Sequence, residues 1–138
     1  MTDLSAFPVT RKWPACHPDR LQLYSLATPN GVKVSVLLEE LGLPYEAHKV
    51  SFETRDQFAP EFLSLNPNNK IPAILDPNGP GGQPLALWES GAILVYLAEK
   101  CGRLLPTDPA APRRRQRALG WGILAFGQGR ASAHLPAT

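Results

Sequence analysis

The chain has 138 residues, of which 43% are hydrophobic and 19% are charged, and its formal net charge is +2. This length and composition are typical of one globular domain with its own core, and the small charge argues against nucleic acid or an anionic membrane as a partner. No apolar run is long enough to span a bilayer, and the first twenty residues lack a secretory signal. We therefore expect a cytoplasmic protein with no membrane partner.

The N-terminal half of the chain predicts an extension, a strand and a helix. Residues 1–20 contain three prolines and show no periodicity, so we expect an extension that covers the domain or is disordered, with Trp13 as its anchor. Apolar and polar residues alternate over residues 21–26, which indicates a first, central strand. A turn at residues 28–31 then leads into a helix that ends at Gly42. Its expected apolar face comprises Val34, Leu37, Leu38 and Leu41.

Five further elements are expected before Gly102. They are strands at 45–50, 73–75 and 85–88, a short helix at 60–65, and a helix that starts at 89 or 90. The first strand–helix–strand unit should be parallel. Glycines at 79, 81 and 82 permit positive φ and a tight reversal, so the last two strands should be antiparallel. The order βαβ then ββα is that of a thioredoxin-like α/β domain over residues 21–102. The expected apolar face of its last helix comprises Leu94, Leu97, Ala98 and Cys101.

A polar turn at residues 66–70 changes abruptly into an apolar run at residues 71–75. Proline cannot donate a ladder hydrogen bond, so Pro72 suits the first position of an edge-facing strand. If the Ile71–Pro72 bond is cis, the amide and carbonyl of Ile71 turn outward, where an extended peptide could pair by strand addition. The alternative is an ordinary strand start, because only about 5–6% of X–Pro bonds are cis.

Glu89 and Ser90 directly precede the last helical pattern, which predicts an anion-binding helix start. Ser90 could accept a hydrogen bond from its own helix and donate one to a carboxylate, while Glu89 could receive an ammonium group. The alternative is a plain N-cap with an acidic neighbour. Together with the main chain of Ile71, this helix start suggests a site for a small anionic peptide.

Three motifs carry a family resemblance. They are Thr28-Pro29-Asn30-Gly31, the stretch from Asn66 to Ala73, and Glu89-Ser90-Gly91-Ala92-Ile93. Their order resembles that of the glutathione transferase family, in particular its bacterial nu-class and yeast prion-like branch, from about Trp13 to Pro106. The resemblance implies glutathione as cosubstrate and glutathione-dependent disulfide-bond reduction, peroxide reduction or conjugation. The second substrate would be a small disulfide or an electrophile, and homodimers occur in the family.

The resemblance also implies roles for two groups of residues. Asn30 and Thr28 would stabilise the glutathione thiolate, since helix starts lower the pKa of a thiol; the alternative is simple turn and cap chemistry. The main chain of Ile71, next to Pro72, would pair with the cysteinyl unit. The remaining implied glutathione contacts are Glu89 and Ser90 at the γ-glutamyl end, Gln57, and Lys70 at the glycyl carboxylate.

Other residues that could carry chemistry rank lower. Tyr24 and Ser25 imitate the catalytic residues of other family branches but lie within the first strand. Cys16 and Cys101 form no Cys-x-x-Cys motif, so a redox thiol would have to come from a ligand. We expect Cys101 in the core and Cys16 to be partly exposed and inert. The three histidines lack metal-ligand spacing, so no metal site is predicted.

Residues 103–138 are expected to form a linker and a truncated helical remnant. Four arginines open a stretch that contains four glycines, and each interior glycine costs a helix about 1 kcal/mol, so we expect one short helix near 113–125 and no bundle. The arginines favour a solvated face over nucleic acid. The motif likeness ends at about Pro112, which suggests a truncated or frame-shifted gene as a hypothesis.

Three functions remain open at this point. The first is a glutathione-dependent enzyme, whose second-domain electrophile pocket has no matching residues in this chain. The second is a glutathione-binding module without turnover. The third is an inactive fragment with an exposed apolar face, for which Leu37, Leu38 and Ile93 are the candidate residues.

Overall fold

The computed structural model describes residues 3–102 of the chain. The expected remnant at 103–138 lies outside them. The described residues fall into two compact units, 3–26 with 44–88 and 27–43 with 89–102, and each is described by itself. The elements of the first unit are α1 (Val9–Lys12), β1 (Leu21–Ser25), β2 (Tyr45–Lys49), η1 (Asp56–Phe58), α3 (Pro60–Leu65), β3 (Ala73–Asp76), η2 (Pro80–Gly82) and β4 (Leu85–Trp88). The second unit contains α2 (Pro29–Leu41) and α4 (Ser90–Cys101).

The first unit is built on a four-stranded sheet with the strand order β2-β1-β3-β4. β1 is parallel to β2 and antiparallel to β3, and β3 is antiparallel to β4, so both predicted strand directions are confirmed. The edge-facing position expected for Pro72 is wrong, because β3 lies between two partners. Pro72 precedes the first residue of β3, where its missing N–H is no loss to the ladder.

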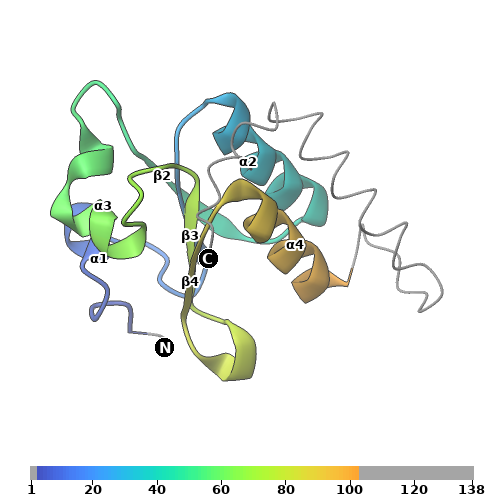
Figure 1. Cartoon of the computed structure of the whole chain (residues 1–138). Helices are drawn as coiled ribbons and strands as arrows, with labels where there is room; N and C mark the ends of the chain where they lie inside the picture. The colour runs from blue at the N-terminus through green and yellow to red at the C-terminus, as the bar shows by residue number, and fades with distance from the viewer. Residues whose placement is uncertain (1–2, 103–138) are drawn as a thin grey trace. The chain divides into compact units, whose positions relative to one another are not determined.

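One face of the sheet carries the core of the first unit. Tyr24 stands opposite Ala73 in the ladder, and both join a cluster with Phe62 of α3 and Val9 of α1. α1 and α3 lie side by side (Figure 1). No periodicity predicted α1, since it is a single turn after Pro8 that is held by this cluster.

Residues 3–20 of the N-terminal extension dock on the sheet. The indole Nε1 of Trp13 donates to the Lys49 carbonyl at 3.0 Å, and its ring meets those of Tyr24 and Phe62 edge-on. Trp13 is therefore the anchor that the sequence predicted. The expectation that the extension covers the domain is met within this unit, and the alternative of disorder is not.

A polar network joins the same extension to β1 and β2. Glu46 accepts hydrogen bonds from the main-chain N–H groups of Cys16 and His17, both at 2.8 Å. The side-chain nitrogen of Gln22 donates to the carbonyls of His17 and Arg20, so its Oε1 is left to face His48 Nε2 at 2.7 Å. Because an amide oxygen only accepts, His48 must carry its proton on Nε2.

The connection between β3 and β4 uses its glycines in two ways. Gly81 and Gly82 have φ values of +68° and +75°, as predicted for a tight reversal. Gly79 has a φ of −73°, so it does not use the positive φ that glycine permits. A Cβ on Gly79 would instead collide with the carbonyl oxygen of Gln83. Gly79 is therefore required for space.

In the described part of the second unit, α2 and α4 pack on each other (Figure 1). Both helices end at a glycine in the left-handed region, Gly42 and Gly102, as predicted. Leu38 and Ile93 are fully buried, so they do not form the exposed apolar face suggested for a fragment. Leu37, Leu94 and Cys101 are half-buried and thus less enclosed than expected. The exposed large apolar side chains within residues 3–102 are Val32, Val36, Phe52 and Phe58.

Candidate functional site

The junction before β3 has the predicted backbone geometry. The Ile71–Pro72 peptide bond is cis. Ladder pairing begins at Ala73, and neither main-chain polar group of Ile71 has a hydrogen-bond partner within residues 3–102. An unpaired amide and carbonyl next to a strand can pair with an extended peptide. Contact of Ile71 and Pro72 with a ligand stays a prediction.

Asn66, which sequence reasoning missed as a structural residue, holds the turn before this junction. Its side chain is buried, its Nδ2 donates to the Lys70 carbonyl at 2.8 Å, and its Oδ1 accepts from the Asn68 N–H at 2.9 Å. The Asn-Pro-Asn-Asn sequence could have suggested such an Asx turn. The Lys70 side chain itself is exposed, and its contact with a ligand remains untested.

Gln57 lies on η1 in the first unit, where its Oε1 is buried and has no hydrogen-bond partner in the described part of the chain. The neighbouring Asp56 fixes this turn by accepting from the Ser51 N–H and the Thr54 hydroxyl, each at 2.9 Å. Burial raises the pKa of Asp56, but these hydrogen bonds and the nearby Lys12 ammonium outweigh it and lower the pKa overall. Gln57 is thus a buried acceptor on a firmly held turn.

The start of α2 contains both residues predicted to face a thiolate. Thr28 is the N-cap, and its hydroxyl accepts from the Gly31 N–H at 3.2 Å, so the expected cap chemistry is present. The sequence predicted that Asn30 precedes the helix. It lies instead within the first turn, because the helix starts at Pro29. Its Oδ1 is buried without a hydrogen-bond partner among residues 3–102. A role of either residue at a thiolate stays a prediction.

The start of α4 differs from the expected capped helix. Glu89 is the N-cap, with a φ of +79° that is rare for a residue with a side chain, and no side chain caps the first turn. Ser90 is the first helical residue and is buried, and within residues 3–102 its Oγ accepts no hydrogen bond from its own helix, contrary to the prediction. Ser90 Oγ instead lies 3.5 Å from the Nζ atom of Lys33, a buried lysine on α2 that sequence reasoning missed.

The surroundings of Tyr24 and Ser25 agree with the prediction that they are weaker candidates for a catalytic role than Thr28 and Asn30. Tyr24 is fully buried, and its hydroxyl has no hydrogen-bond partner within the described residues. Burial first, and then the charge of Glu46, raises the pKa of Tyr24. The phenol is therefore protonated and enclosed in the core, with its ring stacked on that of His48. The Ser25 hydroxyl donates to the neighbouring Leu26 carbonyl at 3.4 Å.

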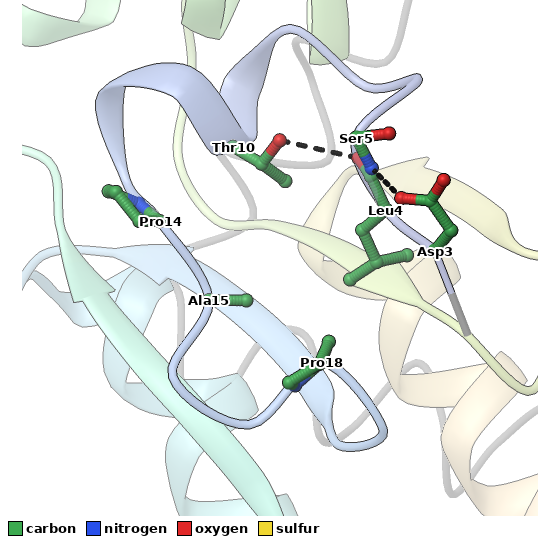
Figure 2. A pocket seen from close by; sticks show the side chains of 7 residues that line it. All are labelled: Asp3, Leu4, Ser5, Thr10, Pro14, Ala15 and Pro18. Atoms are coloured by element: carbon green, nitrogen blue, oxygen red, sulfur yellow. Dashed lines mark hydrogen bonds between the residues drawn. The ribbon is translucent and has the colours of Figure 1, made fainter. Parts of the chain in front are cut away.

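One cavity in the first unit, of about 420 Å³, is lined by the N-terminal extension and is shown in Figure 2. Thr10 hydrogen-bonds to the Leu4 carbonyl at its wall, and none of the predicted site residues lines it.

Among residues 3–102 there is no group of three or more metal-ligating side chains. No helix in that range could cross a membrane. Cys16 is exposed, as expected.

The predicted site residues divide between the two units. Gln57, Lys70, Ile71 and Pro72 belong to the first unit, and Thr28, Asn30, Glu89 and Ser90 belong to the second. In the first unit these residues lie on η1 and directly before β3, and in the second unit they lie at the starts of α2 and α4.

The family model for the glutathione S-transferase N-terminal domain matches residues 19–99. The chain belongs to the glutathione S-transferase family. Two curated relatives from Escherichia coli are disulfide-bond oxidoreductases. YfcG is 50% identical over 102 residues, which cover 73% of this chain and 46% of that protein. YghU is 46% identical over 111 residues, which cover 76% of this chain and 36% of that protein.

Solved structures of glutathione transferases show the same thioredoxin-like α/β fold. The Pseudomonas putida protein, with one glutathione disulfide bound per subunit, is 71% identical with a TM-score of 0.83, and the match covers 91% of this chain and 54% of that one. The Burkholderia graminis protein, with two glutathione molecules bound per subunit, is 68% identical with a TM-score of 0.84, over 92% of this chain and 52% of that one. This chain therefore spans about half the length of these transferases.

Proposed function

We propose that this chain binds glutathione and uses the glutathione thiolate to reduce a disulfide bond. The observation that carries the proposal is the main chain of Ile71, which precedes Pro72 and β3 and has no hydrogen-bond partner within residues 3–102. A cysteinyl residue in extended conformation presents one N–H and one C=O, which match the C=O and N–H of Ile71. Membership of the glutathione S-transferase family makes glutathione the peptide to test first.

Each predicted residue has a part in this proposal. Ile71 pairs with the cysteinyl unit beside Pro72, and Ser90 and Glu89 bind the carboxylate and the ammonium of the γ-glutamyl unit. Gln57 offers an acceptor with no partner among the described residues, and the exposed ammonium of Lys70 can neutralise the glycyl carboxylate.

Thr28 and Asn30 act on the thiol in this scheme. The Thr28 oxygen already accepts from the Gly31 N–H, so its own hydrogen remains available to donate to sulfur. The Asn30 amide lies on the first turn of α2, where the helix dipole also favours negative charge. Both effects stabilise a thiolate over a thiol, and the thiolate is the nucleophile.

The proposed chemistry is two successive thiol–disulfide exchanges. The glutathione thiolate attacks one sulfur of the disulfide, an S–S bond forms to glutathione, and the other sulfur leaves as a thiolate that takes up a proton. A second glutathione thiolate then attacks the glutathione sulfur of the mixed disulfide. It releases the second substrate thiol and yields glutathione disulfide, so two glutathione molecules supply the two electrons.

The relatives support this reaction over others that a thiolate could perform. Both Escherichia coli relatives are named as disulfide-bond oxidoreductases, and the Pseudomonas putida structure holds glutathione disulfide. Conjugation to an electrophile or reduction of a peroxide would use the same thiolate, with a different second substrate.

Calorimetric titration with glutathione tests binding, and turnover of hydroxyethyl disulfide, followed by formation of glutathione disulfide, tests the reaction. We expect Asn30→Ala to lower kcat/KM roughly tenfold to hundredfold, because a hydrogen bond to a charged group contributes about 1.5–3 kcal/mol. Ser35→Ala, on the same helix and outside the predicted site, should leave kcat/KM unchanged. Binding without turnover would make the chain a glutathione-binding module, and absence of binding would overturn the proposal.

A further inference from the structure

Lys33 is a buried cation that forms no ion pair within residues 3–102. It lies on α2, its side chain is only 2% exposed, and Ser90 Oγ at 3.5 Å is its hydrogen-bond partner. Within residues 3–102 no carboxylate lies within ion-pairing distance of it. A lysine has three N–H donors, so at least two of them have no partner there. A buried ammonium without a counter-ion is costly, which calls for a reason to keep it.

The atoms around the Lys33 ammonium are suited to an anion. α4 starts beside it after the N-cap residue Glu89, whose side chain makes no capping hydrogen bond, and the first turn itself contains no acidic residue. The first intrahelical bond runs from the Ile93 N–H to the Glu89 carbonyl, so the preceding N–H groups lie outside the helix ladder. These groups, the helix dipole and the lysine charge all favour a negative group at the same place in the second unit.

The contact between Lys33 and Ser90 also fixes the direction of the serine hydroxyl. An ammonium can only donate, so Ser90 Oγ must be the acceptor in this contact. The hydroxyl hydrogen of Ser90 is then left to donate to a third group, and a carboxylate oxygen is the acceptor that the local charge favours. Burial lowers the pKa of Lys33, as expected for an ammonium that lacks a counter-ion until a ligand arrives.

We propose that Lys33 is a positioning residue for a carboxylate subsite at the start of α4, where it orients Ser90 and supplies the buried counter-charge for the α-carboxylate of a γ-glutamyl peptide. This inference rests on the proposed function and adds to it the residue that sets charge selectivity at that end of the ligand. It requires that Lys33 does not increase the affinity for a ligand with a neutral group in place of the α-carboxylate.

The inference predicts opposite effects on stability and on binding. Lys33→Met removes a buried unpaired charge and keeps most of the side-chain volume, so the ligand-free protein should unfold at the same or a higher denaturant concentration. The same change should weaken glutathione binding. A merely structural lysine would not separate the two, because its loss would lower stability and affinity together.

The test is calorimetric titration of the full chain with glutathione and with its analogue in which the γ-glutamyl α-carboxylate is a carboxamide. Lys33→Met should weaken glutathione binding about tenfold or more and leave analogue binding within about twofold of the wild-type value. Lys33→Arg should retain glutathione affinity within a few fold, and the exposed Lys49→Met is the control for simple loss of charge. Lys33→Gln replaces Lys33→Met, with the same expectation, if the latter does not fold.

Three outcomes would contradict the inference. Unchanged glutathione affinity in Lys33→Met, or equal losses for both ligands, would overturn it and leave the proposed function standing, because the wild-type chain would still bind glutathione. A wild-type chain that does not bind glutathione would overturn both.

Discussion

Asn30 Oδ1 and Gln57 Oε1 are two buried side-chain acceptors without a hydrogen-bond partner among residues 3–102. A buried unsatisfied polar atom costs about 1–3 kcal/mol. The family resemblance implies both residues at the glutathione site. A ligand N–H that reached either oxygen would recover part of this cost, so both atoms favour the ligand-bound state.

Glu46 gives a residue-level prediction about acid stability. Burial raises the pKa of Glu46, but hydrogen bonds from the Cys16 and His17 N–H groups, the nearby His48 and Gln22 lower it overall from its ordinary 4.5. A depressed folded pKa means that the carboxylate stabilises the fold above pH 4.5 and that this stabilisation is lost as the pH falls through the folded value.

We therefore expect Glu46→Gln to lower the free energy of unfolding by about 1–2 kcal/mol at pH 7, with the difference from wild type shrinking below pH 4.5. Urea unfolding across this pH range measures it. Glu40→Gln, an exposed residue on α2, should show little difference at any pH. A gap for Glu46→Gln that does not change with pH would contradict the electrostatic explanation.

Sequence reasoning found the residues of the motifs and missed those whose role depends on packing. Lys33 counts as a polar residue in the helical pattern, and only the packing of α2 on α4 shows that it is buried beside Ser90. The Gln22–His48 contact depends on the register of β1 with β2, which no local pattern specifies. The first turn of α2 contains Asn30 because Pro29 is a favourable first helical residue.

At the level of elements, periodicity and end signals predicted strand and helix bounds to within about a residue. Alternation over residues 21–26, and glycines at 42 and 102, are strong local signals. The inner position of β3 was missed because strand order is set by contacts far apart in sequence. α1 was missed because one turn has no period to detect.

The connection between β3 and β4 separates two reasons for a glycine. Gly79→Ala should lower the free energy of unfolding by roughly 2–3 kcal/mol, because its Cβ would collide with a main-chain carbonyl that cannot move freely. Gly81→Ala should cost only about 1–2 kcal/mol, since its Cβ meets no atom and the penalty is the positive φ. Urea unfolding compares them, and an equal or reversed order would refute this explanation.

Trp13 gives a second prediction at this scale. Trp13→Phe keeps an aromatic ring but leaves the Lys49 carbonyl without its donor, so we expect a loss of about 1 kcal/mol. Trp13→Ala also removes the edge-on contacts with Tyr24 and Phe62 and should cost roughly 3 kcal/mol. Similar losses for the two variants, measured by urea unfolding, would show that the ring contacts contribute little.

At the scale of the whole molecule, a ligand that binds only the folded state raises its stability. At a glutathione concentration about 100 times the dissociation constant, the gain is about 2.7 kcal/mol, which raises the Tm by roughly 5–10 °C. Differential scanning fluorimetry over a glutathione series measures this, with glycylglycine as the control. A Tm that does not depend on glutathione concentration would contradict the proposed function.

β2 is an outer strand of the sheet, and residues before position 19 hydrogen-bond to it: Trp13 to the Lys49 carbonyl, and the main-chain N–H groups of Cys16 and His17 to the Glu46 side chain. The family match starts at residue 19, so a chain trimmed to that boundary would lose these three hydrogen bonds to β2. The main-chain N–H and C=O groups on the open edge of β2 could then pair with a strand of a second molecule. We expect the trimmed chain to form soluble polymers that grow with concentration, detectable by light scattering, while the full chain stays free of them.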